Sequence, residues 1–145
     1  MIKQILLVED NASDEKLTLI ALKKCEVQNQ VIVVRDGAEA LDYLFATGAH
    51  AERAHLPALI LLDLKLPKVS GIEVLRRIRT DERTRALPVV ILTSSKLDED
   101  VADGYTSGAS AYVRKPVAYA EFLAAAKAIG SFWLLLNELP AEVNR

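Results

Sequence analysis

The sequence predicts a single α/β domain built on a parallel sheet. Five short apolar runs are separated by longer amphipathic segments, and four of the runs are rich in Val, Ile and Leu and lack an alternation of apolar and polar residues. An unbroken apolar run is typical of a strand covered on both faces, as in a parallel sheet between helices. Strand and helix alternate five times, which indicates right-handed crossover connections. At 145 residues the chain is long enough to bury roughly two-thirds of its unfolded surface in one core.

Each expected element has its own boundaries. The expected strands are Gln4–Val8, Val31–Val34, Ala58–Leu62, Val89–Leu92 and Ala111–Val113, the last with the weakest pattern. The expected helices are Ala12–Cys25, Ala38–Ala46, Gly71–Thr80, Asp98–Tyr105 and Ala118–Asn137. An Asp-Gly pair precedes the second helix, a Ser-Gly pair follows the fourth and a proline follows the fifth, and such residues are typical of helix ends. The connection Thr47–Pro57 is longer than is usual between a helix and a strand.

Composition narrows the class of protein. The chain carries 18 basic and 20 acidic residues, a net charge of −2, which argues against a nucleic-acid or anionic-membrane binder. A single cysteine, Cys25, excludes an intrachain disulfide and a cysteine-based zinc site, and it fits a reducing cytoplasm. No apolar run approaches the roughly 18 residues of a membrane span, and no signal peptide is evident.

The residues that bear chemistry follow the strands. Carboxylates follow the first and third strands, hydroxyl groups end the fourth and an ammonium group follows the fifth, in the set Glu9, Asp10, Asp63, Thr93, Ser94 and Lys115. Because the carboxyl ends of parallel strands lie at one edge of the sheet, we expect these side chains to converge there.

This set of groups suits phosphoryl transfer. Neighbouring carboxylates repel one another unless positive charge intervenes, and Lys115 with a Mg²⁺ ion would supply that charge. Asp63 follows a buried strand, so its carboxylate could attack a phosphoryl group and hold it as an aspartyl phosphate. Thr93 could donate a hydrogen bond to a phosphoryl oxygen. Phosphoryl transfer requires mainly alignment and charge neutralisation, which these groups provide.

The same residues fall within an ordered series of motifs. These are Val8-Glu9-Asp10-Asn11, Leu61-Leu62-Asp63-Leu64-Lys65-Leu66-Pro67 with Gly71, Leu92-Thr93-Ser94, Gly108-Ala109, and Tyr112-Val113-Arg114-Lys115-Pro116. With these motifs the chain resembles, over nearly its whole length, the receiver domain of two-component response regulators. The resemblance implies a flavodoxin-like (βα)5 three-layer sandwich with strand order 2-1-3-4-5. It also implies a protein that accepts a phosphoryl group from a sensor histidine kinase.

The resemblance assigns a role to each residue of the metal and phosphate site. Asp63 would be the phosphoacceptor and also a metal ligand, and Asp10 would bind Mg²⁺ directly. Glu9, which stands where many receivers have aspartate, would act through water. The backbone carbonyl of Lys65 would complete the metal site, and its side chain occupies a position that tunes the loss of phosphate in this family.

Further roles concern the response to phosphate. Thr93, followed by Ser94, would be the switch hydroxyl, and Tyr112 the switch aromatic. Lys115 would contact the phosphate and precede a cis Pro116. Phosphorylation would then change the surface made by the fourth helix, the fifth strand and the fifth helix.

The last helix predicts a second contact surface. At 100° per residue one apolar stripe should face the sheet, and it comprises Tyr119, Phe122, Ala126, Ile129, Trp133 and Leu136. Phe132, Leu135 and Leu139 fall on another face, which would serve a homodimer or the kinase, or would pack on a neighbouring helix of the chain. The segment 132–140 resembles that of single-domain regulators paired with phytochrome histidine kinases. We therefore expect a receiver domain at residues 1–140 with no output domain, and a phytochrome-like kinase as partner.

Other interpretations stay open on the sequence alone. A phosphohydrolase of the haloacid dehalogenase type also uses Asp, Thr or Ser, Lys and Mg²⁺, but it requires an aspartate where Lys65 stands. A non-phosphorylated interaction module would not need the set of Asp10, Asp63, Thr93 and Lys115. His50 and His55 share the long connection without a third ligand, so we expect exposed loop histidines rather than a metal site.

Overall fold

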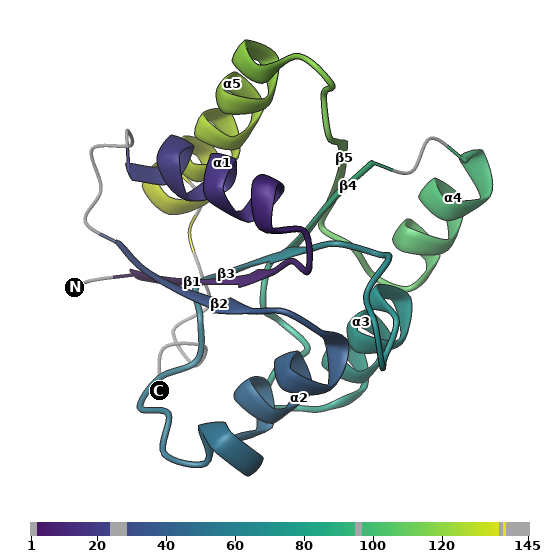
Figure 1. The fold of residues 1–145 in the computed structure, drawn as a ribbon. Coiled ribbons are helices and arrows are strands. Elements are labelled where there is room, and N and C mark those ends of the chain that lie inside the picture. Colours follow the sequence, from purple (N-terminus) through teal and green to yellow (C-terminus); the bar gives the residue numbers. More distant parts are fainter. Residues whose placement is uncertain (1–2, 24–28, 95–96, 137, 139–145) are drawn as a thin grey trace.

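A computed structural model describes residues 3–23, 29–94, 97–136 and 138. Five parallel strands form one sheet in the order β2-β1-β3-β4-β5 (Figure 1). The strands are β1 (Lys3–Val8), β2 (Asn29–Val34), β3 (Leu59–Leu62), β4 (Val89–Thr93) and β5 (Ala111–Arg114). The helices are α1 (Ala12–Lys23), α2 (Gly37–Phe45), α3 (Gly71–Thr80), α4 (Asp98–Thr106) and α5 (Tyr119–Gly130). The flavodoxin-like fold expected from the sequence is confirmed.

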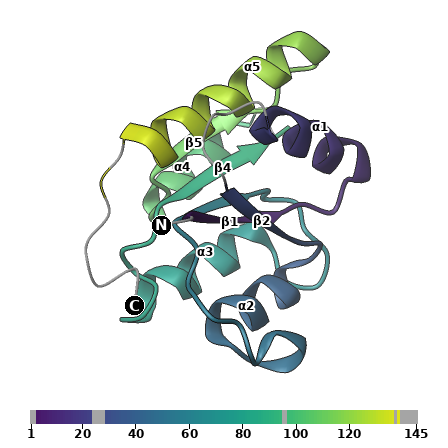
Figure 2. The same cartoon turned by 90° about the vertical axis from the view of Figure 1, so that its left-hand side faces the viewer.

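The sheet is covered on both faces, which makes three layers (Figures 1 and 2). Alternate residues of each central strand point to opposite faces, so that Leu61 of β3 packs toward α1 and α5 while Leu62 packs toward α2 and α3. All side chains of β3 and β4 are buried. This two-sided burial explains why these strands read as continuous apolar runs. No helix in the described part of the chain is long and apolar enough to cross a membrane.

The side chains of the residues that precede α2 and α3 cap the N-termini of these two helices. The Asp36 carboxylate accepts a hydrogen bond from the backbone N–H of Glu39 at 2.7 Å, and the Ser70 hydroxyl accepts one from that of Glu73 at 3.3 Å. Each supplies a partner to an N–H that the helix cannot satisfy itself. The predicted bounds of these helices were correct within one residue for α2 and correct for α3.

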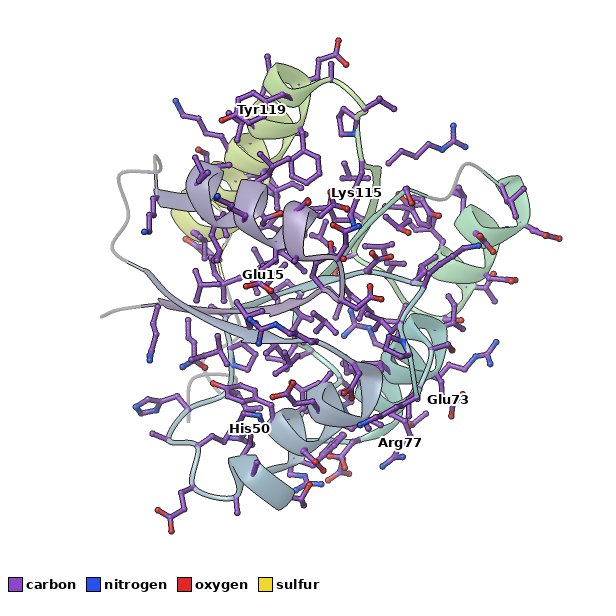
Figure 3. All side chains as sticks on the ribbon, viewed as in Figure 1. Glu15, His50, Glu73, Arg77, Lys115 and Tyr119 are labelled. Carbon is purple, nitrogen blue, oxygen red and sulfur yellow. The ribbon has the colours of Figure 1, made fainter. Side chains whose placement is uncertain are left out.

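The end of the last helix departs from the predicted periodicity. After Gly130 the chain continues as a π-helical turn, η2 (Ser131–Leu136), in which bonds run from i to i+5. The wider turn changes the phase, so Leu134 is buried and Trp133 is only half-buried. The predicted inward stripe is correct for Phe122, Ala126 and Ile129. It is wrong for Tyr119, which is 57% exposed and lies at the outer end of α5 (Figure 3).

The structure also tests the expected cis peptide bond and the expected exposure of the two loop histidines. No cis peptide bond occurs among the described residues, so the expected cis bond before Pro116 is wrong. The connection after α2 contains a short 3-10 helix, η1 (Gly48–His50). Its histidine is half-buried, lies 3.0 Å from the Glu39 carboxylate and packs edge-on against Tyr43, whereas His55 is exposed as expected. Cys25 lies outside the described residues.

Candidate functional site

Lys115 is the centre of the polar cluster at the carboxyl edge of the sheet (Figure 3). Its ammonium nitrogen Nζ donates to Glu9 Oε1 at 2.5 Å, to Asp63 Oδ2 at 2.8 Å and to Asp14 Oδ2 at 2.9 Å. These acceptors come from the ends of β1 and β3 and from the first turn of α1. An ammonium group has three N–H donors. All three are therefore used by carboxylates.

The Asp63 carboxylate is held on both oxygens. Its Oδ1 accepts hydrogen bonds from the Thr93 hydroxyl at 2.9 Å and from the backbone N–H of Lys65 at 3.2 Å, and its Oδ2 faces Lys115. Gly71 lets the chain pass close behind Asp63, because a Cβ at this position would lie 2.3 Å from the Asp63 carbonyl oxygen. The three hydrogen bonds fix the direction of the carboxylate.

Three carboxylates form a candidate metal site. One oxygen from each of Glu9, Asp10 and Asp63 lies within 4.8 Å of the others, a spacing that would allow one ion to contact them. Asp10 is exposed whereas Glu9 and Asp63 are buried, so the site opens to solvent on one side. Hard divalent cations take oxygen ligands of this kind, and the donor set fits the expected ion. The role of the Lys65 backbone carbonyl as a metal ligand stays a prediction.

Burial and the neighbouring charges shift the pKa values of Glu9, Asp63 and Lys115 in opposite directions. Burial raises the pKa of Glu9 to about 7, although the Lys115 ammonium works against this rise. Burial also disfavours the ionised form of Asp63, but the Lys115 ammonium outweighs it and lowers the pKa of that carboxyl below its usual value. Burial disfavours the charged Lys115, yet its hydrogen bonds to Asp63, Glu9 and Asp14 raise its pKa. The lowered pKa favours the ionised form of Asp63, and Lys115 is its positive partner.

Of the predicted switch residues, Thr93 contacts the site and Tyr112 lies against α4. Thr93 is fully buried against Asp63, whereas Ser94 is exposed at the end of β4 and contacts none of the site carboxylates in the hydrogen bonds described. Tyr112 of β5 is half-buried beside α4, where a Cβ at Gly104 would lie 3.1 Å from the Tyr112 ring. The glycine therefore permits a close approach between α4 and the aromatic ring.

Asp14 is a member of the cluster that sequence reasoning missed. It lies on the helix that follows β1, four positions after Asp10. The available signal was its place in the first turn of α1, one helical turn after the predicted metal ligands. Acids are common in the first turn of a helix because they suit the helix dipole, and this ordinary role concealed it.

The predicted contact surface on the last helix is described in part. Phe132 is 48% exposed and packs edge-on against Trp133, with ring centroids 5.0 Å apart. Ala124 and Ala128 lie before it on the helix and are also exposed. The side chain of Leu135 and the whole of Leu139 lie outside the described residues.

Comparison with known sequences gives one consistent family. Residues 5–127 match the model of the response regulator receiver domain. Response regulator Rcp1 of Synechocystis is 38% identical over 139 residues, with 96% of this chain and 94% of that protein covered. The probable methanogenesis regulatory protein FilR2 of Methanothrix harundinacea is 39% identical over 136 residues, which cover 94% of this chain and 86% of FilR2.

Solved structures agree with the sequence matches. The phosphorylated cyanobacterial phytochrome response regulator RcpA is similar with a TM-score of 0.93 and 39% identity, covering 97% of this chain and all of that one. The Mn²⁺-bound form of Rcp1 has a TM-score of 0.91 at 37% identity, with 96% and 99% covered. The bacteriophytochrome response regulator RtBRR is 52% identical with a TM-score of 0.76, and 99% of this chain and 87% of that chain are covered.

Proposed function

The chain belongs to the response regulator receiver family, whose members are phosphoacceptors in signalling rather than classical enzymes, and from this premise we propose that Asp63 is the phosphoacceptor. The observation that carries this proposal is the pair of opposed contacts on its carboxylate. The Thr93 hydroxyl binds one oxygen and the Lys115 ammonium binds the other. Both donors stand where a phosphoryl group on Asp63 would need hydrogen bonds, and the pKa of Asp63 lies below its usual value.

The reaction then exchanges one bond for another. A carboxylate oxygen of Asp63 forms a bond to phosphorus as the P–N bond to a kinase phosphohistidine breaks, and the electron pair of that bond stays on the imidazole nitrogen. Asp63 changes from a carboxylate to a neutral acyl phosphate linkage, and the negative charge moves to the phosphoryl oxygens. Lys115 and Thr93 hold those oxygens in place.

Receiver domains bind a divalent cation at an acidic pocket, as the Mn²⁺-bound Rcp1 does, and we propose Mg²⁺ as the ion for this chain. Asp10 and Asp63 would hold the ion directly, Glu9 would act through water and Lys65 would contribute its carbonyl. When bound, the ion neutralises negative charge on the carboxylates and on the incoming phosphoryl group.

The relatives support a sensor histidine kinase as the partner. RcpA and RtBRR are phytochrome response regulators, which favours a phytochrome-type kinase for this chain. We place the exchange in the cytoplasm, where the lone cysteine would stay reduced. Residues 1–140 would form the receiver domain, and the output would be its own α4-β5-α5 surface rather than a nucleic acid or membrane contact. The exposed Phe132, with Leu135 and Leu139, would support a homodimer or contact the kinase.

The haloacid dehalogenase alternative is not favoured. An enzyme of that type needs a second acid two residues after the nucleophile, and this position holds the exposed Lys65. The carboxylic acid that protonates the leaving group in that mechanism is therefore missing. The family match to receiver domains points the same way.

One experiment tests the phosphoacceptor. The wild type, Asp63→Asn and Asp100→Asn are incubated with acetyl phosphate and Mg²⁺, and intact-mass spectrometry counts phosphate per chain. We expect one phosphate on the wild type and on Asp100→Asn, whose acid lies on α4 rather than at a strand end. Asp63→Asn should take up none. Stoichiometric uptake by Asp63→Asn would overturn the assignment, and continuous release of phosphate without an adduct would favour a hydrolase.

A further inference from the structure

Asp14 reaches the site from a helix rather than from a strand end. Its backbone is fixed in the first turn of α1, where its N–H donates to Asn11 Oδ1 at 3.0 Å and its carbonyl accepts from the Thr18 hydroxyl at 2.8 Å. Its side chain extends to Lys115, 101 positions away along the chain, with Oδ2 at 2.9 Å from Nζ. None of the roles assigned above uses this carboxylate.

The three partners of Lys115 cannot all be kept when phosphate arrives. Each N–H of the ammonium already has a carboxylate acceptor. A phosphoryl oxygen on Asp63 therefore gains a hydrogen bond from Lys115 only when one of these acceptors gives way. Which acceptor leaves depends on what each would lose.

Asp14 is the partner that leaves at least cost. The Glu9 side chain is 2% exposed, so water cannot replace Lys115 as its hydrogen-bond partner. The Asp14 side chain is 27% exposed, so water can replace the ammonium as its partner. The N–H that faces Asp63 can pass directly to the phosphoryl group that Asp63 carries, so a second N–H becomes available to that group only when Asp14 leaves.

We propose that Asp14 is a latch on Lys115, which keeps one N–H of the ammonium occupied in the unphosphorylated protein and releases it to the phosphoryl group when Asp63 is phosphorylated. This role makes Asp14 a positioning residue that slows phosphorylation. Release also removes one tie between Lys115 and α1, a helix that packs directly on α5. The proposal rests on the proposed function in so far as Lys115 binds the phosphoryl group.

The neighbouring Glu15 provides a matched control. It lies one position later in the same helical turn, and its carboxylate pairs with Arg35 at 3.1 Å instead of Lys115. Glu15→Gln removes the same unit of charge as Asp14→Asn. A difference between the two variants therefore reports the contact with Lys115 and not the general field of the helix.

The first measurement is the rate of phosphorylation by acetyl phosphate at saturating Mg²⁺, over a range of donor concentrations. We expect Asp14→Ala to raise the maximal rate about three- to tenfold, Asp14→Asn to raise it less because its amide oxygen still accepts a hydrogen bond, and Glu15→Gln to match the wild type. The rise should lie in the maximal rate rather than in the donor concentration at half-maximal rate. A maximal rate of Asp14→Ala equal to that of Glu15→Gln, or below the wild type, would overturn the latch.

The second measurement needs neither metal nor phosphate. Exchange of the Lys115 ammonium protons with water, followed by nitrogen-15 NMR, should be faster in Asp14→Ala than in the wild type and Glu15→Gln. Unchanged exchange would overturn the contact itself. A wild type that exchanges slowly yet takes up no phosphate would contradict the proposed function while leaving the contact established.

Discussion

Lys115 Nζ lies 2.8 Å from Asp63 Oδ2, which joins the residue that follows β5 to the residue that follows β3, 52 positions earlier. Both side chains are buried, and β4 separates their strands in the sheet. The ion pair therefore crosses one strand at the carboxyl edge, above Thr93 at the end of that strand. A change in the charge on Asp63 acts directly on the group that connects β5 to the site.

Removing the ammonium should destabilise the protein. In Lys115→Met the buried Glu9 and Asp63 lose their positive partner, and breaking such a buried pair costs about 3–5 kcal/mol. Urea unfolding at neutral pH should show a loss of this order, and added Mg²⁺ should recover part of it because it restores positive charge. Lys65→Met is the control, since it removes an exposed lysine at the same edge. Equal stability of the two variants would contradict the ion-pair account.

Metal affinity should depend on Asp10. Asp10→Asn removes one of the three carboxylates that lie within reach of a common ion, so calorimetric titration should show Mg²⁺ affinity reduced at least about tenfold. Glu73→Gln changes the charge equally on the exposed face of α3 and should leave the affinity near that of the wild type. If both variants bind Mg²⁺ alike, Asp10 is not a ligand.

Arg79 should stabilise the fold without a carboxylate partner in the described contacts. Its guanidinium donates to the carbonyls of Gly108, Arg85 and Leu87 at 2.7 to 3.0 Å, which ties α3 to the segments before β4 and β5. Arg79→Met leaves these carbonyls unpaired and should lower the free energy of unfolding by about 2–4 kcal/mol. Arg76→Met, at an exposed position on the same helix, should cost about 0.5 kcal/mol or less. Similar losses would refute the bridging role.

Self-association should depend on Phe132. Burying its half-exposed ring and its apolar neighbours would contribute a few kcal/mol before association costs, enough for a weak homodimer. Sedimentation with and without acetyl phosphate should show dimers of the wild type at tens of micromolar, roughly the range of a weak interface. Phe132→Glu should stay monomeric.

The control for charge is Ala51→Glu, which adds the same charge in the exposed connection after α2, far from α5 (Figure 1). It should sediment like the wild type. If the wild type remains monomeric both with and without acetyl phosphate, this surface of the last helix would contact the kinase alone.

The sequence by itself determined the elements and the edge where the site forms. Buried parallel strands need apolar residues on both faces, so the end of each strand can be identified in the sequence where the apolar run stops. The topology places the carboxyl ends of all strands at one edge of the sheet. This is why Glu9, Asp63, Thr93 and Lys115 were predicted to converge and do so. The strand order itself came from the family resemblance, because periodicity carries no information on which strands are neighbours.

Only the tertiary structure decided the contacts that depend on how a helix sits against the sheet. The reach of Asp14 to Lys115 requires the angle of α1, and the burial of Leu134 in place of Trp133 requires the π-helical turn after Gly130. His50 is likewise held by Glu39 and Tyr43 because the long connection folds back on α2. Such contacts join residues whose local sequence is compatible with several positions. Packing against the rest of the molecule selects one of them, so no local pattern could have specified it.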